Sequence, residues 1–215
     1  MTGERPAGPQ RQARGLLRIE RILDAADALI QREGTVEIGL QEVAKAAGLP
    51  AASIYHYFAT TPALLMALAQ RYHAGFEVLA ARRIDHDRLA QWSDLCAIQA
   101  EQALRFYREH PVAMRLFLGP QGGWEVRVAD LATNRRIGAI YYRRLIQHFV
   151  VAESPALEDA FDVSVAISDA IWSLSYARSG TVEPAMATEA LRARVAYLRL
   201  YVGEHAAKRE RPLEA

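Results

Sequence analysis

The sequence predicts an all-α protein, with an N-terminal three-helix helix-turn-helix domain followed by a larger helical ligand-binding and dimerisation domain. Two observations lead to this fold class. Apolar residues recur three and four positions apart along nearly the whole chain, as in amphipathic helices, and no segment alternates as a β-strand does. Near the N-terminus, a glycine and a proline separate two short helical segments, which is typical of a helix-turn-helix. A length of 215 residues allows one or two domains with a substantial core.

The N-terminal segment, residues 1–15, is basic. It contains Arg5, Arg11 and Arg14 among Gly, Pro and Gln residues. Two interpretations stay open for it: a disordered tail, or a flexible arm that touches DNA phosphates or a minor groove. The first helix follows and ends at Gly34. Its apolar stripe, which should pack on the next two helices, is formed by Ile19, Ile22, Leu23, Ala26, Leu29 and Ile30.

The helix-turn-helix occupies residues 40–58. Its first helix has an apolar face made of Leu40, Val43, Ala44 and Ala47. Gly48 suits the end of this helix, because glycine adopts the left-handed conformation without a steric penalty. Pro50 suits the first turn of the second helix, where its missing N–H costs nothing. The second helix of such a pair can enter the major groove of DNA.

The residues around this turn also match a known pattern. Its fixed places are occupied by Val43-Ala44, Ala47-Gly48, Ser53-Ile54-Tyr55, Tyr57-Phe58 and Leu64-Leu65. Over residues 18–68 the chain resembles the DNA-binding domain of the TetR family of transcriptional regulators. The resemblance implies contacts with operator bases and phosphates at Ala51, Ala52, Ser53, Tyr55 and His56.

The sequence departs from this family pattern at a few positions. Thr61 stands where the family usually has a lysine, and the other departures are Gly39, Pro50 and Ala52. No Lys or Arg occurs between Lys45 and Arg71, and the net charge of +1 gives no general attraction to nucleic acid. The salt-dependent part of DNA binding should therefore come from Arg18, Lys45 and the arm.

Composition limits the remaining possibilities. Cys96 is the only cysteine, which rules out an internal disulfide and favours a reducing, cytoplasmic location. The sequence shows neither a signal peptide nor an apolar run of about 20 residues, so a membrane partner is not expected. The cluster Asp85-His86-Asp87 is interpreted as a helix junction, because side chains of adjacent residues do not converge on one ion. We expect no metal and no cofactor.

The larger domain should occupy residues 61–207, after a DNA-binding domain at residues 16–60 and before a frayed tail at 208–215. Thr61 and Pro62 suit the start of a helix that ends near residues 84–86. Further helices are predicted at about 89–109, 111–118, 126–151, 156–179 and 184–207.

Bulky residues on several of these helices are candidates for a ligand pocket, although each could equally be ordinary core. They are Trp92, Leu95, Phe106, Phe117, Tyr141, Leu145, Trp172 and Tyr176. Asp169 interrupts an apolar run, and a buried carboxylate needs a partner. We expect that partner to be an arginine across a dimer, Arg192 or Arg194, in preference to a cationic or hydroxylated ligand.

A stripe of small residues, Ala166, Ala170, Ser173 and Ala177, favours a close contact between helices. The contact could be internal or lie at a dimer interface. The family resemblance implies a homodimer through the last two helices, with the last helix contributing Leu191, Val195, Leu198 and Val202. A dimer would present two recognition helices to the half-sites of a palindrome.

Together these features predict a ligand-responsive regulator, a repressor released from a palindromic DNA operator by a small-molecule effector. One alternative is a helical protein-interaction module that has lost DNA binding. An enzyme on a helical bundle is a weaker alternative, because the sequence contains neither a Gly-x-Ser-x-Gly nor a Glu-x-x-His motif.

Overall fold

The protein is described here from a computed structural model, which covers residues 9–214. These residues divide into two compact units between Leu68 and Ala69. The first unit contains α1 (Pro9–Glu33), α2 (Leu40–Ala46), α3 (Ala51–Tyr57) and the start of α4 (Thr61–Ala80). The second contains the rest of α4, then η1 (His86–Arg88), α5 (Trp92–Glu109), α6 (Pro111–Leu118), η2 (Pro120–Gly122), α7 (Gly123–His148), β1 (Phe149–Val150), α8 (Pro155–Ser179), α9 (Pro184–Val202) and β2 (Ala207–Lys208).

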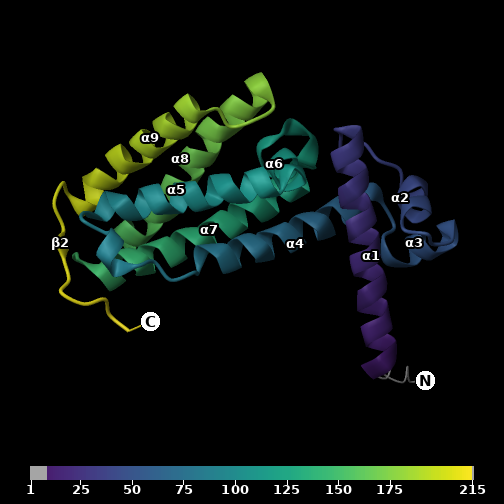
Figure 1. Ribbon diagram of the computed structural model, residues 1–215, viewed down its shortest axis with the longest axis horizontal. Coiled ribbons are helices and arrows are strands. Elements are labelled where there is room, and N and C mark those ends of the chain that lie inside the picture. Colours follow the sequence, from purple (N-terminus) through teal and green to yellow (C-terminus); the bar gives the residue numbers. More distant parts are fainter. Residues whose placement is uncertain (1–8, 215) are drawn as a thin grey trace. The chain divides into compact units, whose positions relative to one another are not determined.

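In the first unit, α2 and α3 pack beside α1 (Figure 1). The predicted stripe of α1 is buried except at Ile19, which is half-buried, and the core of this unit also contains Leu40, Val43, Ala44, Ile54 and Phe58. Gly48 has a φ of +61°, and a Cβ there would lie 2.8 Å from Nη2 of Arg21. The positive φ is what favours glycine here, because the end of the Arg21 side chain could move away from a Cβ. Gly39 cannot cap α2 with a side chain, and Oε2 of Glu42 instead accepts from the Gly39 N–H at 2.9 Å.

In the second unit, α8 is packed between α7 and α9 (Figure 1). The approach of α7 to α8 depends on Gly138, because a Cβ there would lie 2.9 Å from the Cα of Asp162. The core of this unit is apolar and includes Leu89, Trp92, Leu95, Leu145, Phe149, Leu157, Phe161 and Leu198. In the described part of the chain, no helix is both long enough and apolar enough to span a membrane.

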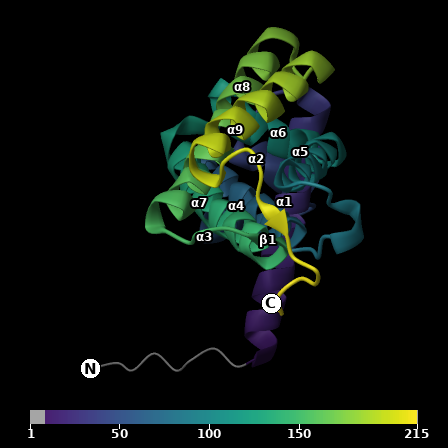
Figure 2. The ribbon, with the colours of Figure 1, turned by 90° about the vertical axis from the view of Figure 1, so that its left-hand side faces the viewer.

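The C-terminal segment differs from the prediction. The last helix ends at Val202, not near residue 207, because the next residue, Gly203, has a φ of +81°. The chain then forms β2, which pairs antiparallel with β1 and places Phe149 opposite Lys208 (Figure 2). Beyond β2, the Leu213 N–H donates to the Gln147 carbonyl at 2.9 Å. The segment 207–213, which we call the C-terminal strap, is thus bound to the end of α7.

Other helix and domain boundaries also differ from those predicted from the sequence. α1 begins at Pro9, so residues 9–15 of the predicted flexible arm are helical, whereas residues 1–8, including Arg5, lie outside the described part of the chain. α4 ends at Ala80, several residues before the predicted end, and α7 runs from Gly123 to His148. The boundary between the units lies within α4, whereas the sequence placed it before this helix.

Candidate DNA interface and ligand cavity

The outer face of α3 is the candidate DNA interface. Tyr55 is 49% exposed, whereas Ile54 is fully buried, so the helix has the rotation that the sequence predicts. Ala51, Ala52 and His56 are also exposed, and Ser53 is half-buried. Ala51, Ala52 and Ser53 lie in the first turn of the helix, whereas Tyr55 and His56 lie toward its C-terminal end.

The predicted cations lie on other helices of the same unit. Lys45 is exposed in the last turn of α2, and Arg18 is exposed on α1. Thr61, which stands in place of the usual lysine, is half-buried, and its hydroxyl donates to the Ile38 carbonyl at 3.3 Å. It therefore serves the packing of this unit. DNA contacts at all these positions stay predictions.

The second unit contains an internal cavity of about 30 Å³. Its walls come from α4, α5, α6, α7, α8 and α9. A volume of this size holds about one or two water molecules. A larger molecule must therefore displace the walls.

Some predicted pocket residues line this cavity and others do not. Phe117, Tyr141 and Trp172 line it. The remaining predicted residues lie elsewhere: Trp92, Leu95, Phe106, Leu145 and Tyr176. Trp92, Leu95 and Leu145 are in the apolar core, and Trp92 also donates from Nε1 to the Glu204 carbonyl at 3.3 Å. Phe106 packs edge-on against Phe76 at a ring distance of 5.0 Å.

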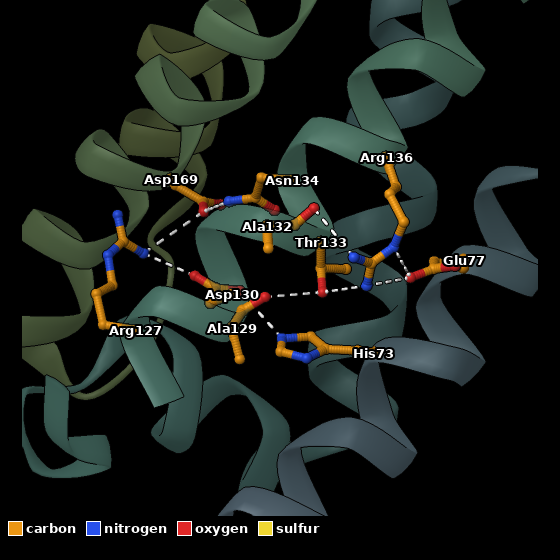
Figure 3. A network of polar contacts seen from close by, with 10 residues as sticks. All are labelled: His73, Glu77, Arg127, Ala129, Asp130, Ala132, Thr133, Asn134, Arg136 and Asp169. Carbon is orange, nitrogen blue, oxygen red and sulfur yellow. Dashed lines mark hydrogen bonds and ion pairs between the residues drawn. The ribbon is translucent and has the colours of Figure 1, made fainter. Parts of the chain in front are cut away.

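One end of the cavity is acidic. Asp130 on α7 accepts from Nη1 of Arg127 at 2.7 Å, and its other oxygen lies 3.3 Å from Nε2 of His73 on α4 (Figure 3). Asp169 on α8 accepts from Nδ2 of Asn134 at 2.5 Å and lies 3.8 Å from Nη1 of Arg127. The network thus joins α4, α7 and α8 through buried side chains.

Within one chain Asp169 contacts Asn134 and Arg127, and its pairing with an arginine across a dimer stays a prediction. Arg192 pairs with Glu189 on its own helix at 2.6 Å, and Arg194 points into the chain, where it is 3% exposed. Neither guanidinium bonds Asp169 within the chain, where Arg127 and Asn134, one helix away, already serve this carboxylate. The requirement for a partner was correct, but a sequence does not show which helix supplies it.

Burial shifts the pKa values of two side chains that line the cavity, Asp169 and Tyr141. Burial and the neighbouring Asp130 carboxylate raise the pKa of Asp169 from 3.8 to about 7, against the lowering effect of Asn134 and Arg127. Burial also raises the pKa of Tyr141 to about 12, although the Arg194 guanidinium lowers it. The charge of Asp169 therefore changes near neutral pH.

A second group of residues lining the cavity supplies hydrogen-bond donors. Arg194 donates from Nη2 to Oε1 of Gln99 at 2.7 Å, and its Cζ lies 4.9 Å from the centre of the Tyr141 ring. Gln99 was not predicted as a cavity residue, and Asp130, Asn134, Arg127 and His73 were also missed. A polar residue within an apolar helical stripe was the available signal for Gln99 and Asp169.

The predicted dimer face is partly exposed. Ala170 and Ala177 are exposed, and Ala166 and Ser173 are half-buried. On α9, Leu191, Val195 and Val202 are half-buried against the core. Leu198 is fully buried within the chain, so it is a core residue and is not available to a partner. Exposed apolar residues that the prediction lacked lie on these two helices, at Val163, Leu174, Leu200 and Tyr201.

Comparison with known proteins identifies the N-terminal unit. Residues 22–68 match the family model described as bacterial regulatory proteins, tetR family. These residues therefore form a TetR-type DNA-binding domain. A crystal structure of a TetR-family transcriptional regulator from Streptomyces coelicolor has the same fold: it aligns over 86% of this chain and 99% of that one, with a TM-score of 0.64 and 22% identity. The fold class predicted from the sequence is thereby confirmed.

Other TetR-like proteins show the range of relatives. An HTH-type transcriptional repressor of Mycobacterium tuberculosis is 28% identical over 163 residues, which is 76% of this chain and 58% of the relative. This chain thus matches little more than half the length of that relative. The crystal structure of the multidrug binding protein EbrR, complexed with imidazole, aligns over 88% of this chain and 90% of that one, with a TM-score of 0.54 and 20% identity.

Proposed function

We propose that this chain is a TetR-family DNA-binding transcriptional repressor that a small-molecule effector releases from its operator. The observation that carries the proposal is the orientation of α3: Ile54 and Phe58 anchor the helix in the core, while Tyr55 and His56 are left exposed. A recognition helix must have this division between packing and contact. Repression is suggested by the M. tuberculosis relative, which is an HTH-type transcriptional repressor.

The effector site is the cavity of the second unit. Its lining combines aromatic rings with a few buried polar groups, which is the usual composition of a small-molecule site. EbrR, which has the same fold, is described as a multidrug binding protein. The cavity is much smaller than the roughly 300 Å³ or more of most ligand pockets, so binding requires its walls to move.

α4 provides the connection between cavity and operator. Leu64, Leu65 and Leu68, in its first half, are buried, and His73 and Phe76, in its second half, line the cavity. A ligand that displaces α4 favours a different set of conformations from those that bind DNA. Ligand and operator must then weaken each other's binding by the same factor.

The same proposal includes a homodimer through the exposed faces of α8 and α9. Their exposed apolar residues at Val163, Leu174 and Leu200 are costly to leave in water. A dimer also supplies the second recognition helix that a palindromic operator requires.

The test is to incubate the purified protein with sheared genomic DNA of its source at low salt and to sequence the retained fragments. We expect a small set of fragments that share a palindrome. The control is Tyr55→Ala, which should retain far less of the same fragments. Retention no better than that of random DNA would instead support the interaction-module alternative.

A further inference from the structure

The buried guanidinium of Arg194 has no carboxylate partner among the described residues. The side chain is on α9, and only 3% of the residue is exposed. Its neighbours are the amide oxygen of Gln99 at 2.7 Å and the face of Tyr141 at 4.9 Å, both uncharged. A neutral amide and a ring face compensate a buried charge only in part. A buried cation in this setting requires an anion to complete it.

The hydrogen-bond inventory of the cavity points in the same direction. Arg194 Nε, Gln99 Nε2 and Trp172 Nε1 are buried without a hydrogen-bond partner in the described structure. All of these atoms are donors, and all of their residues line the cavity. Leaving a buried donor unpaired costs free energy, so this group of donors requires acceptors. A carboxylate provides acceptors only, with two oxygens that can each accept more than one hydrogen bond.

The acidic end of the cavity does not need a ligand in the same way. Asp130 already has Arg127 at 2.7 Å and His73 at 3.3 Å. Asp169 already has Asn134 at 2.5 Å. A cationic ligand would have to compete with these contacts, whereas an anion could accept from Nε of Arg194, which has no hydrogen-bond partner in the described structure. Because the unpaired buried atoms that line the cavity are all hydrogen-bond donors, the cavity favours an anion over a cation.

The remaining lining residues indicate that the apolar part of the ligand is an aromatic ring. Aromatic side chains surround the space, namely Phe76, Tyr107, Phe117, Tyr141 and Trp172. Aromatic rings pack well against one another in offset and edge-to-face arrangements. The cavity of about 30 Å³ is too small for a six-membered ring, so such a ligand must push its walls apart.

We propose that the effector of this cavity is a small aromatic monocarboxylate, whose carboxylate binds Arg194, Gln99 and Trp172 and whose ring lies among the aromatic side chains. This inference rests on the proposed function, since it names the chemistry of the effector. Binding of this kind supplies both the missing charge and the displacement of the walls that release from DNA requires.

The experiment measures binding to the full chain without DNA, by calorimetry and by the melting temperature. The probes are benzoate, 4-hydroxybenzoate and phenylacetate, with benzamide as the neutral analogue and benzamidine as the cationic one. We expect at least one carboxylate to bind and to raise the melting temperature. Benzamide should bind at least about tenfold more weakly than benzoate, because it has lost the charge, and benzamidine should not bind.

Variants identify the contact. Arg194→Met keeps an apolar stem of similar length, and loss of the charge pair should weaken carboxylate binding by about 30-fold or more. The matched control is Arg192→Met, on the exposed face of the same helix, which should bind like the wild type. Gln99→Leu is a second variant, in case Arg194→Met does not fold, and it should also weaken binding.

Three outcomes would overturn the inference: no carboxylate binds at millimolar concentration, benzamidine binds more tightly than benzoate, or Arg194→Met and Gln99→Leu both bind like the wild type. The result is separate from the regulatory proposal. A protein that retains operator fragments but binds no carboxylate disproves only the ligand. A protein that binds benzoate but retains no DNA disproves only the regulation.

Discussion

At the scale of single residues, Tyr55 and Phe58 have opposite roles within one helical turn of α3. Tyr55 is 49% exposed and Phe58 is 7% exposed. Tyr55→Ala should weaken operator binding and leave the melting temperature nearly unchanged. Phe58→Ala should cost about 3–5 kcal/mol of unfolding free energy, because it removes a buried ring. Thermal melts and DNA titration of both variants check this, and equal thermal losses would mean that the assigned faces are wrong.

Asp169 makes stability depend on pH. Its pKa is raised from 3.8 to about 7 in the folded chain, so the folded state binds more protons than the unfolded state between these values. Stability should therefore fall as the pH rises from about 4 to 7. Asp169→Asn should raise the unfolding free energy by roughly 1–4 kcal/mol at pH 8 and change it little at pH 4.

Denaturant melts at both pH values measure this difference. The new amide oxygen can still accept from Asn134, so the packing is preserved. Asp159→Asn, at an exposed position on the same helix, is the control and should have no such pH dependence. An Asp169→Asn variant less stable than the wild type at pH 8 would show that the carboxylate is ionised and well compensated.

At the scale of elements, the C-terminal strap is held by a pair of histidines. Nδ1 of His86 lies 2.9 Å from Nδ1 of His148, and Nε2 of His86 lies 2.9 Å from the Arg209 carbonyl. The Arg209 carbonyl can only accept, so Nε2 of His86 donates to it. The direction of the hydrogen bond between the two Nδ1 atoms depends on the histidine tautomers. Burial, His86, Arg144 and Lys208 lower the pKa of His148 from 6.5 to about 4.

This pair should make the strap sensitive to acid. A histidine with a lowered pKa stabilises the fold fully above pH 6.5, and the contribution is lost as the pH falls toward 4. Amide exchange at Arg209 and Leu213, corrected for the intrinsic rate, should therefore accelerate at pH 5 relative to pH 7. In His148→Gln, the side chain at position 148 stays neutral. The corrected exchange rate of each amide should then be the same at pH 5 and at pH 7. An acceleration that persists in this variant would place the titrating group elsewhere.

Helix positions were well predicted because they depend on local rules. Pro111, Pro184 and Gly180 are helix boundary signals, and α6 and the ends of α8 lie within a residue of their predicted places. The strap was not predicted, because β2 is two residues long and gains its partner from a segment far away in sequence. The charged network was missed for the same reason: the contact of His73 with Asp130 spans 57 positions.

At the scale of the whole molecule, dimerisation depends on the exposed face of α8. Ala170 is exposed and lies in the middle of this face. Ala170→Arg would place a long charged side chain where helices must approach closely, so the variant should be monomeric at micromolar concentration. Sedimentation of the variant and the wild type measures this. Ala152→Arg, at an exposed loop position, should remain dimeric, and a dimeric Ala170→Arg would exclude this face as the interface.

The central claim is that the state of the cavity controls DNA binding. Ala103 is 4% exposed and lines the cavity, so Ala103→Phe fills the space as a ligand would. Ala190→Phe, at a fully buried position outside the cavity lining, is the control for overpacking, which costs about 1–3 kcal/mol in either place. The decisive measurement is the affinity of both folded variants for the retained operator fragment. We predict that Ala103→Phe binds the operator about tenfold more weakly than Ala190→Phe. Equal operator affinities for the two variants would contradict the account.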